Sequence, residues 1–171
     1  DFQALTRILD LILPVLDSHP FKWLNIGGGY LFDQPDQVDK LIQLIRQIKK
    51  RYAIEIFMEP GKGLVNAAGF LATRVIDSFE SDGKTVVVVD ATVNHHPEIF
   101  EYQKPAELLY QAGNQTAIVA GCSCLAGDIL GEYAFQNLPT MNQVLVFSNV
   151  GAYSLIKANR FNGYNLPAIY F

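Results

Sequence analysis

The fold class is decided by two stretches, Trp23-Leu24-Asn25-Ile26-Gly27-Gly28-Gly29 and Ile54-Glu55-Ile56-Phe57-Met58-Glu59-Pro60-Gly61. In each stretch a short apolar run ends in a glycine turn, which is the pattern of a buried strand. The apolar positions between the two stretches recur at the spacing of one helix face: Val38, Leu41, Ile42, Ile45 and Ile48. A strand, a helix and a second strand in this order predict a βα unit of a parallel sheet or barrel.

Two helices are predicted in this part of the chain. The one between the strands should begin at Pro35-Asp36, with the aspartate as its N-cap. The basic residues at 49–51 fall near its predicted end, where the helix dipole favours cations. An earlier helix is predicted from apolar residues at helix spacing, although Pro14 should kink or end it. Those apolar residues are Leu5, Ile8, Leu9, Ile12 and Leu16.

After Lys62 the pattern changes to that of a β domain. Strands are predicted over residues 70–79 and 85–89, because Ser81-Asp82-Gly83 between them is a hairpin turn signal. Later strands are predicted over residues 116–120, 143–147 and 168–171. No helix in this part is as clear as those before it.

These patterns predict an α/β part over residues 1–64 and a mostly antiparallel β domain over residues 65–171. Two barrel-type strands are too few for a closed barrel, which needs about eight. The α/β part should therefore be incomplete and need something outside this sequence.

Composition limits the functional classes. Of the 171 residues 50% are hydrophobic and 18% charged, which is typical of a globular chain. The net charge of -4 gives no electrostatic footprint for nucleic acid or an anionic membrane. We find no apolar run long enough to span a bilayer and expect no signal peptide. Cys122 and Cys124 are too close in sequence for an unstrained disulfide, so we interpret them as thiols in a reducing, cytoplasmic setting.

Two turns that follow the predicted strands contain residues that could bind a ligand. Three successive glycines, Gly27-Gly28-Gly29, could cradle a phosphate, or they could form a tight turn at a barrel rim. Glu59 ends the second strand, where a carboxylate could hold a proton on a ring nitrogen. Lys62 could neutralise a phosphate. The alternative for these two residues is a solvated ion pair on a surface turn.

The β domain offers weaker candidates. The stretch 121–128 follows an apolar strand, and a thiol there could be a proton donor, a nucleophile or a small core residue. A metal site of the two cysteines with His95 and His96 has little support, because adjacent histidines have no particular zinc spacing. Asp90 could be a loop cap. Tyr153 could donate its hydroxyl to a phosphate or simply pack.

The order of these motifs resembles the C-terminal half of the fold-type III decarboxylases, which include ornithine, diaminopimelate and carboxynorspermidine decarboxylases. The similarity runs from about Trp23 to the end. It is carried by the two glycine-containing turns, then by Gly121-x-x-Cys124-x-x-x-Asp128, Gly151-Ala152-Tyr153 and Phe161-Asn162-Gly163. The last part of the chain looks most like the carboxynorspermidine branch. So does Leu125, where the other branches usually carry an acidic residue.

The resemblance implies a pyridoxal 5'-phosphate enzyme whose Schiff-base lysine lies outside this chain. Residues 1–64 would then be the C-terminal portion of the cofactor-binding (β/α)8 barrel. Cys124 would be the catalytic proton donor and would reach into the partner's site in a homodimer. The residues implied to bind the cofactor are Gly27, Gly28, Gly29, Glu59, Gly61, Lys62 and Tyr153. Those expected to contact a small amino-acid substrate are Asp90, His96, Glu98 and Asp128.

Three interpretations remain open from sequence. The first is a decarboxylase of a basic or polyamine-type amino acid, with a carboxynorspermidine-like substrate favoured over diaminopimelate or ornithine. The second is a non-catalytic dimerisation module, and the third is a relative with another reaction, such as a racemase.

The chain departs from the family pattern at one lysine. The family usually has arginine where this chain has Lys62, which keeps the charge but loses the planar guanidinium fork. Lys157-Ala158-Asn159 mimics the family's lysine motif only by coincidence of sequence.

Overall fold

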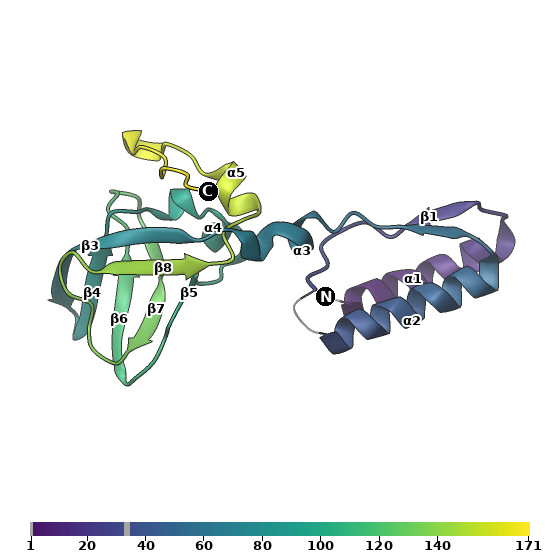
Figure 1. Cartoon of the computed structure of the whole chain (residues 1–171), viewed down its shortest axis with the longest axis horizontal. Helices are drawn as coiled ribbons and strands as arrows, with labels where there is room; N and C mark the ends of the chain where they lie inside the picture. The colour runs from purple at the N-terminus through teal and green to yellow at the C-terminus, as the bar shows by residue number, and fades with distance from the viewer. Residues whose placement is uncertain (1, 33–34) are drawn as a thin grey trace. The chain divides into compact units, whose positions relative to one another are not determined.

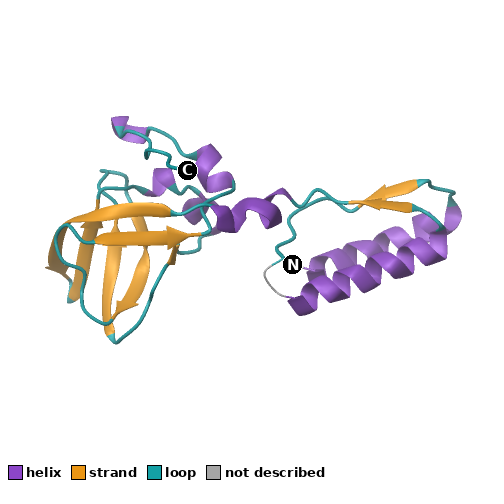
Figure 2. Cartoon of the chain, viewed as in Figure 1, coloured by secondary structure: helices purple, strands orange, loops and turns teal. Residues whose placement is uncertain are grey.

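The computed structural model describes residues 2–32 and 35–171. The chain divides into two compact units, one up to Val65 and one over Asn66–Phe171. Figure 1 traces both along the chain, and Figure 2 shows that the strands of the second unit gather into one sheet. Each unit is described here by itself.

The first unit contains two long helices and a parallel pair of strands. Its elements are α1 (Phe2–Ser18), β1 (Trp23–Asn25), α2 (Pro35–Tyr52), β2 (Glu55–Phe57) and α3 (Gly61–Val65). β1 and β2 pair in parallel, with Trp23 opposite Glu55. The core is formed by Leu5, Leu9, Leu16, Tyr30, Leu41, Ile48 and Ile54. These residues come from α1, from α2 and from the segments beside the strands, so the predicted strand–helix–strand order is confirmed.

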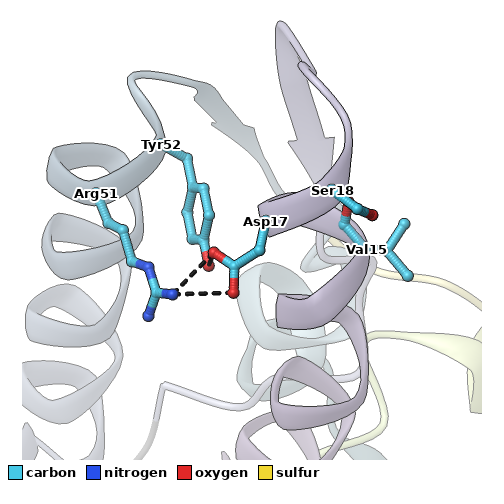
Figure 3. Close-up of polar contacts among 5 residues, drawn as sticks. All are labelled: Val15, Asp17, Ser18, Arg51 and Tyr52. Carbon is cyan, nitrogen blue, oxygen red and sulfur yellow. Dashed lines mark hydrogen bonds and ion pairs between the residues drawn. The ribbon is translucent and has the colours of Figure 1, made fainter.

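Asp17 joins the end of α1 to the end of α2. Figure 3 shows Arg51 and Tyr52 pointing toward its carboxylate. Nη2 of Arg51 lies 2.8 Å from Oδ1, and the hydroxyl of Tyr52 donates to the same oxygen at 2.8 Å. The Arg51 guanidinium also lies 5.0 Å from the centre of the Tyr52 ring. The helix pair is therefore fastened at this end by polar contacts as well as by its core.

The second unit is built on a six-stranded sheet that nearly closes on itself. Its strands are β3 (Leu71–Ser81), β4 (Lys84–Val89), β5 (Glu107–Leu108), β6 (Gln115–Ala120), β7 (Ile129–Phe135) and β8 (Val144–Ser148). Their order is β5-β8-β3-β4-β6-β7, and every pair is antiparallel except β4 with β6. Next to β5, the N–H of Ala106 donates to the carbonyl of Leu130 in β7 at 2.9 Å. This bond links the two edges of the sheet.

β3 serves both halves of this sheet. Residues 71–74 pair with β8, and the register shifts between Val75 and Asp77 where the strand turns to pair with β4. The core inside the sheet is apolar and includes Val75, Val87, Val89, Val119, Leu130 and Phe147. The short helices η2 (Val93–His95) and α4 (Glu98–Tyr102) connect β4 to β5. Another, η1 (Asn66–Ala68), precedes β3, and α5 (Tyr153–Lys157) and η3 (Phe161–Gly163) follow β8.

Several predictions of local structure are confirmed and several are wrong. The hairpin through Asp82-Gly83 is present between β3 and β4. α1 continues through Pro14, because the buried residues on both sides of the proline keep the helix packed against the core. Asp36 lies inside the first turn of α2 and is not its N-cap, since the helix begins at Pro35.

The predicted strand at 168–171 is wrong, because those residues are exposed and have no strand partner among the described residues. The description as mostly antiparallel holds with one exception, the parallel pairing of β4 with β6. No eight-stranded barrel is present within residues 2–32 and 35–171. No helix in the described part of the chain is long and apolar enough to cross a membrane.

Candidate active site

The glycine turn of the first unit lies against Glu59, the second residue after β2. The N–H of Glu59 donates to the carbonyl of Gly27 at 2.8 Å. A Cβ on Gly28 would collide with the Glu59 carbonyl, so only glycine allows this close approach. Gly27 and Gly29 have positive φ angles of 71° and 86°, and a Cβ at either position would meet no atom within 4 Å. The turn is therefore tight on one side and open on the other.

Asn25, the last residue of β1, connects the turn to the Glu59 side chain. Its Oδ1 accepts from the N–H of Gly27 at 2.8 Å, and its Nδ2 donates to Oε1 of Glu59 at 2.6 Å. The carboxylate of Glu59 is thus held beside the glycine turn. Gly61 and Lys62 begin α3, and the N–H of Gly61 donates to the Glu59 carbonyl at 2.9 Å. The candidate residues of the first unit therefore lie near one another at the ends of the paired strands β1 and β2.

The thiols of the second unit lie in a loop between β6 and β7. Cys124 is exposed, and its Sγ accepts from Nδ2 of Asn162 at 3.1 Å. Cys122 is partly buried, and its carbonyl accepts from the Tyr164 hydroxyl at 2.5 Å. Burial raises the pKa of the Cys122 thiol. The two thiols therefore have different environments although only Ser123 separates them.

Asp128 closes this loop. It is buried, and its carboxylate accepts from the N–H of Val93 at 2.8 Å and from the N–H of Ser123 at 2.9 Å. The Ser123 hydroxyl donates to the same carboxylate at 2.5 Å. Burial lowers the pKa of the nearby His95, an effect that the charge of Asp128 opposes. Asp128 therefore contacts the η2 segment as well as its own loop.

Two buried polar side chains meet the side chain of Ser154, which belongs to α5. The hydroxyl of Ser154 donates to Oε2 of Glu98 at 2.9 Å and lies 2.5 Å from Nδ1 of His96. Ser154 is 0% exposed, Glu98 4% and His96 6%. Both His96 and Glu98, which we expected to contact the substrate, are thus engaged inside the unit. Tyr153 directly precedes Ser154 and is half exposed. Nζ of Lys157 lies 4.9 Å from the centre of the Tyr153 ring.

Asp90 follows β4 directly and faces β3. Its Oδ1 accepts from the hydroxyl of Thr73 at 2.6 Å and from the N–H of Arg74 at 2.8 Å. Asp90 is nevertheless exposed. It therefore combines the cap role that the sequence allowed with access to solvent.

The candidate residues form two groups, one in each unit. The first unit holds Gly27, Gly28, Gly29, Glu59, Gly61 and Lys62, and the second holds Tyr153, Cys124, Asp90, His96, Glu98 and Asp128. Sequence reasoning missed Asn25 and Ser154 as partners of these groups. Ser154 directly follows Gly151-Ala152-Tyr153 and Asn25 lies two residues before Gly27, and this closeness to a motif was the only signal available. No three metal-ligating side chains gather anywhere in the described ranges.

Residues 14–151 match the family model of the pyridoxal-dependent decarboxylases, C-terminal sheet domain. The chain belongs to this family. The resemblance drawn from the ordered motifs is thereby confirmed, although the match covers the sheet domain and not the whole of a decarboxylase.

Two relatives in the pyridoxal-dependent decarboxylase family are similar in sequence to this chain over most of its length. A carboxynorspermidine/carboxyspermidine decarboxylase of Herminiimonas arsenicoxydans is 30% identical over 88% of this chain and 42% of its own length. A carboxyaminopropylagmatine decarboxylase of Synechocystis is 34% identical over 99% of this chain and 46% of its own length. This chain thus spans less than half the length of both relatives.

A solved structure of this family has the same fold. The crystal structure of carboxynorspermidine decarboxylase from Campylobacter jejuni, complexed with norspermidine, superposes with a TM-score of 0.83. It is 27% identical, and the match covers 96% of this chain and 50% of that chain. The arrangement of helices and strands described above is therefore that of part of a family member.

Proposed function

We propose that the full-length protein is a pyridoxal-phosphate-dependent amino-acid decarboxylase to which this chain contributes cofactor-binding residues and a proton donor. The observation that carries the proposal is the pairing of Gly27 with Glu59, which sets an open glycine turn beside a carboxylate. The family match and the names of the relatives support it. The first unit would be the last portion of the cofactor-binding barrel.

The residues of the first unit fit the cofactor. The open side of the turn at Gly27 and Gly29 leaves room for a phosphate, and glycine lets a ligand approach the backbone. Pyridoxal phosphate, when bound, supplies an electron sink for the electron pair left behind by carbon dioxide. Glu59 would hold the proton on the ring nitrogen. Asn25 would orient that carboxylate through its 2.6 Å bond.

Further residues would complete the cofactor site. Lys62 would add positive charge near the phosphate, Gly61 would let the backbone approach it, and Tyr153 would donate its hydroxyl. The lysine that attaches the cofactor would come from sequence outside this chain. In a homodimer, each site would be shared between subunits.

The thiol of Cys124 would donate a proton to the carbon that has lost carbon dioxide. Its exposure supports this role, because a proton donor must reach the substrate, and Cys122 is less exposed. Asp90 is exposed with a carboxylate that could contact an amine of the substrate. A carboxynorspermidine-like substrate is favoured by the relatives named for it, with diaminopimelate as the alternative because a Bacillus subtilis diaminopimelate decarboxylase is 31% identical over 91% of the chain.

Replacement of Glu59 tests the proposal. Glu59→Gln keeps an oxygen that can accept from Asn25 but removes the charge that holds the ring proton. In the full-length protein we expect turnover to fall by about a hundredfold or more, as for loss of a proton-holding group. The control is Glu55→Gln, which removes an exposed carboxylate of β2 that pairs with Lys49 of α2. Unchanged turnover in Glu59→Gln, or an equal loss in both variants, would contradict the proposal.

The substrate is tested separately. The full-length protein would be assayed with carboxynorspermidine, diaminopimelate and ornithine at equal concentration. The proposal expects the highest kcat/KM for the first. No decarboxylation of any of the three would favour the non-catalytic dimerisation module instead.

A further inference from the structure

The carboxylate of Asp128 has all its visible hydrogen-bond partners inside the protein. Oδ1 accepts from the N–H of Val93 at 2.8 Å. Oδ2 accepts from the N–H and from the hydroxyl of Ser123, at 2.9 Å and 2.5 Å. Only 6% of the residue is exposed. A side chain that binds substrate must be reachable from solvent, whereas Asp128 is almost fully buried and both of its oxygens accept from protein donors.

The donors belong to two different segments. Ser123 lies beside Cys124 in the thiol loop, which we define as residues 121–128, and Val93 begins η2. Backbone bonds reinforce the same arrangement. The N–H of Gly121 donates to the Asp128 carbonyl at 2.7 Å, and the N–H of Cys122 donates to the carbonyl of Ala91 at 3.0 Å. Asp128 therefore joins the thiol loop at both of its ends and ties it to the segment after β4.

The negative charge of Asp128 strengthens its hydrogen bonds to Val93 and Ser123. Hydrogen bonds to an ionised carboxylate are roughly twice as strong as neutral ones. A buried carboxylate that loses its donors is costly, so the loop and η2 are held in one arrangement. Cys124 lies in the middle of the loop. Among the described contacts its side chain has one hydrogen bond, in which Sγ accepts from Nδ2 of Asn162. Its position thus depends on the residues on either side of it.

We propose that Asp128 is the positioning residue of the thiol loop: it places Cys124 for proton transfer and does not contact the substrate. The proposal deepens the proposed function and rests on it, because it assigns to Asp128 a role that acts through Cys124. It replaces the substrate contact that the sequence motif suggested for Asp128.

Amide hydrogen exchange tests whether Asp128 holds the thiol loop and η2 together, without any catalytic assay. Asp128→Asn keeps the shape of the side chain, but its single carbonyl oxygen can accept from Val93 or from Ser123 and not from both, and its NH₂ group faces the remaining N–H. We expect the amide proton of at least one of these two residues to exchange about tenfold faster or more, as a locally opened segment does. The amide of Val119 in β6 should be unchanged. Asp77→Asn is the matched control, since this exposed carboxylate accepts only from the adjacent N–H of Ser78 in the described contacts.

Unchanged exchange at Val93 and Ser123 in Asp128→Asn would overturn the proposal. If Asp128→Asn does not fold, Ser123→Ala provides the same test, because it removes one donor to the carboxylate and leaves its charge. Faster exchange at Val93 in Ser123→Ala supports the proposal, and unchanged exchange overturns it.

Steady-state kinetics of the full-length protein distinguish positioning from substrate contact. For a positioning residue we expect Asp128→Asn to lower kcat about tenfold or more while KM changes less than about twofold. A higher KM at unchanged kcat indicates substrate contact and overturns the proposal. Failure of the proposed function looks different: Cys124→Ala would then leave turnover unchanged, while the exchange at Val93 would still respond to Asp128.

Discussion

The carboxylate of Asp128 occupies the space that a Cβ atom on Gly121 would need. Such a Cβ would lie closer to Cγ, Oδ1 and Oδ2 of Asp128 than the 3.0 Å that real Cβ atoms keep. The backbone at Gly121 is not in the left-handed region. Glycine is therefore required at this position for space and not for conformational freedom, and the glycine and the aspartate of the motif depend on each other.

Gly121→Ala should destabilise the second unit through this collision. We expect the free energy of unfolding to fall by about 1–3 kcal/mol, as for overpacking of a filled site. In an Asp128→Ala background the same substitution should cost almost nothing, because the colliding atoms are gone. Denaturant unfolding of wild type, the two single variants and the double variant measures this coupling.

The control for this cycle is Gly61→Ala. A Cβ at Gly61 would meet no atom within 4 Å, and its backbone is not left-handed, so we expect little change. Additive losses for Gly121→Ala and Asp128→Ala would mean that the two residues do not share this space.

The first unit should lose stability in acid through Asp17. The hydroxyl of Tyr52 donates to its carboxylate and lowers the pKa of Asp17 below 3.8, with a further contribution from Arg51. A lowered pKa in the folded state means that the stabilisation is present above the unfolded pKa and is lost as pH falls through the folded pKa. Denaturant unfolding of wild type and Asp17→Asn between about pH 5 and pH 2 measures the difference.

The two curves for Asp17 should converge as pH falls. Tyr52→Phe removes the largest cause of the shift, so it should reduce the difference between the Asp and Asn forms at neutral pH. Parallel curves across the whole range would show that Asp17 does not stabilise the helix pair in its charged form.

Local patterns predicted the parts of this fold that depend on local sequence. The periodicity of Val38 to Ile48 and the turn at Asp82-Gly83 specify a helix and a hairpin almost independently of the rest. The strand β7 was missed because it contains Gly131 and Glu132 and lacks an alternating pattern. It is specified by pairing with β6, which is a tertiary effect. The strand prediction at 168–171 was wrong for the opposite reason. These residues are apolar, but they pair with no strand in the described part of the chain.

The candidate site was predictable only as a set of motifs. The positions of Gly27 and Glu59 follow from the rule that parallel strands end at the same edge of a sheet. The burial of His96 and Glu98 could not be read from sequence, because it depends on Ser154, which lies more than fifty residues away along the chain. Polar residues in a loop look the same whether they face a ligand or each other.

Ser154→Ala should destabilise the second unit. The hydroxyl proton goes to Glu98, so the 2.5 Å contact with Nδ1 of His96 requires a proton on that nitrogen. Removal of the hydroxyl takes one partner from each of two buried groups, which typically costs about 1–3 kcal/mol. Denaturant unfolding measures the loss, with the exposed Ser78→Ala as control. An unaffected Ser154→Ala would indicate that water or another group satisfies both partners.

Alkylation should distinguish the two thiols. Cys124 is exposed, whereas burial makes Cys122 less accessible and raises its pKa, which lowers its thiolate fraction. We expect iodoacetamide to label Cys124 first when samples are quenched at intervals and mapped by mass spectrometry. Equal rates would show that the loop opens faster than the reagent reacts. In Cys122→Ala the rate at Cys124 should be unchanged, because no described contact joins the two sulfur atoms.

The catalytic roles of the thiols should differ in the same direction. In the full-length protein we expect Cys124→Ala to lower productive decarboxylation by about a hundredfold or more, which is the usual range for a lost general acid. The carbon that has lost carbon dioxide would then be protonated by water or at another position, so product identity should change as well. Cys122→Ala is the matched control, because it removes a thiol from the same loop and should cost stability more than turnover. Turnover and product analysis of both variants decide between them, and a larger loss for Cys122→Ala would move the proton donor to that residue.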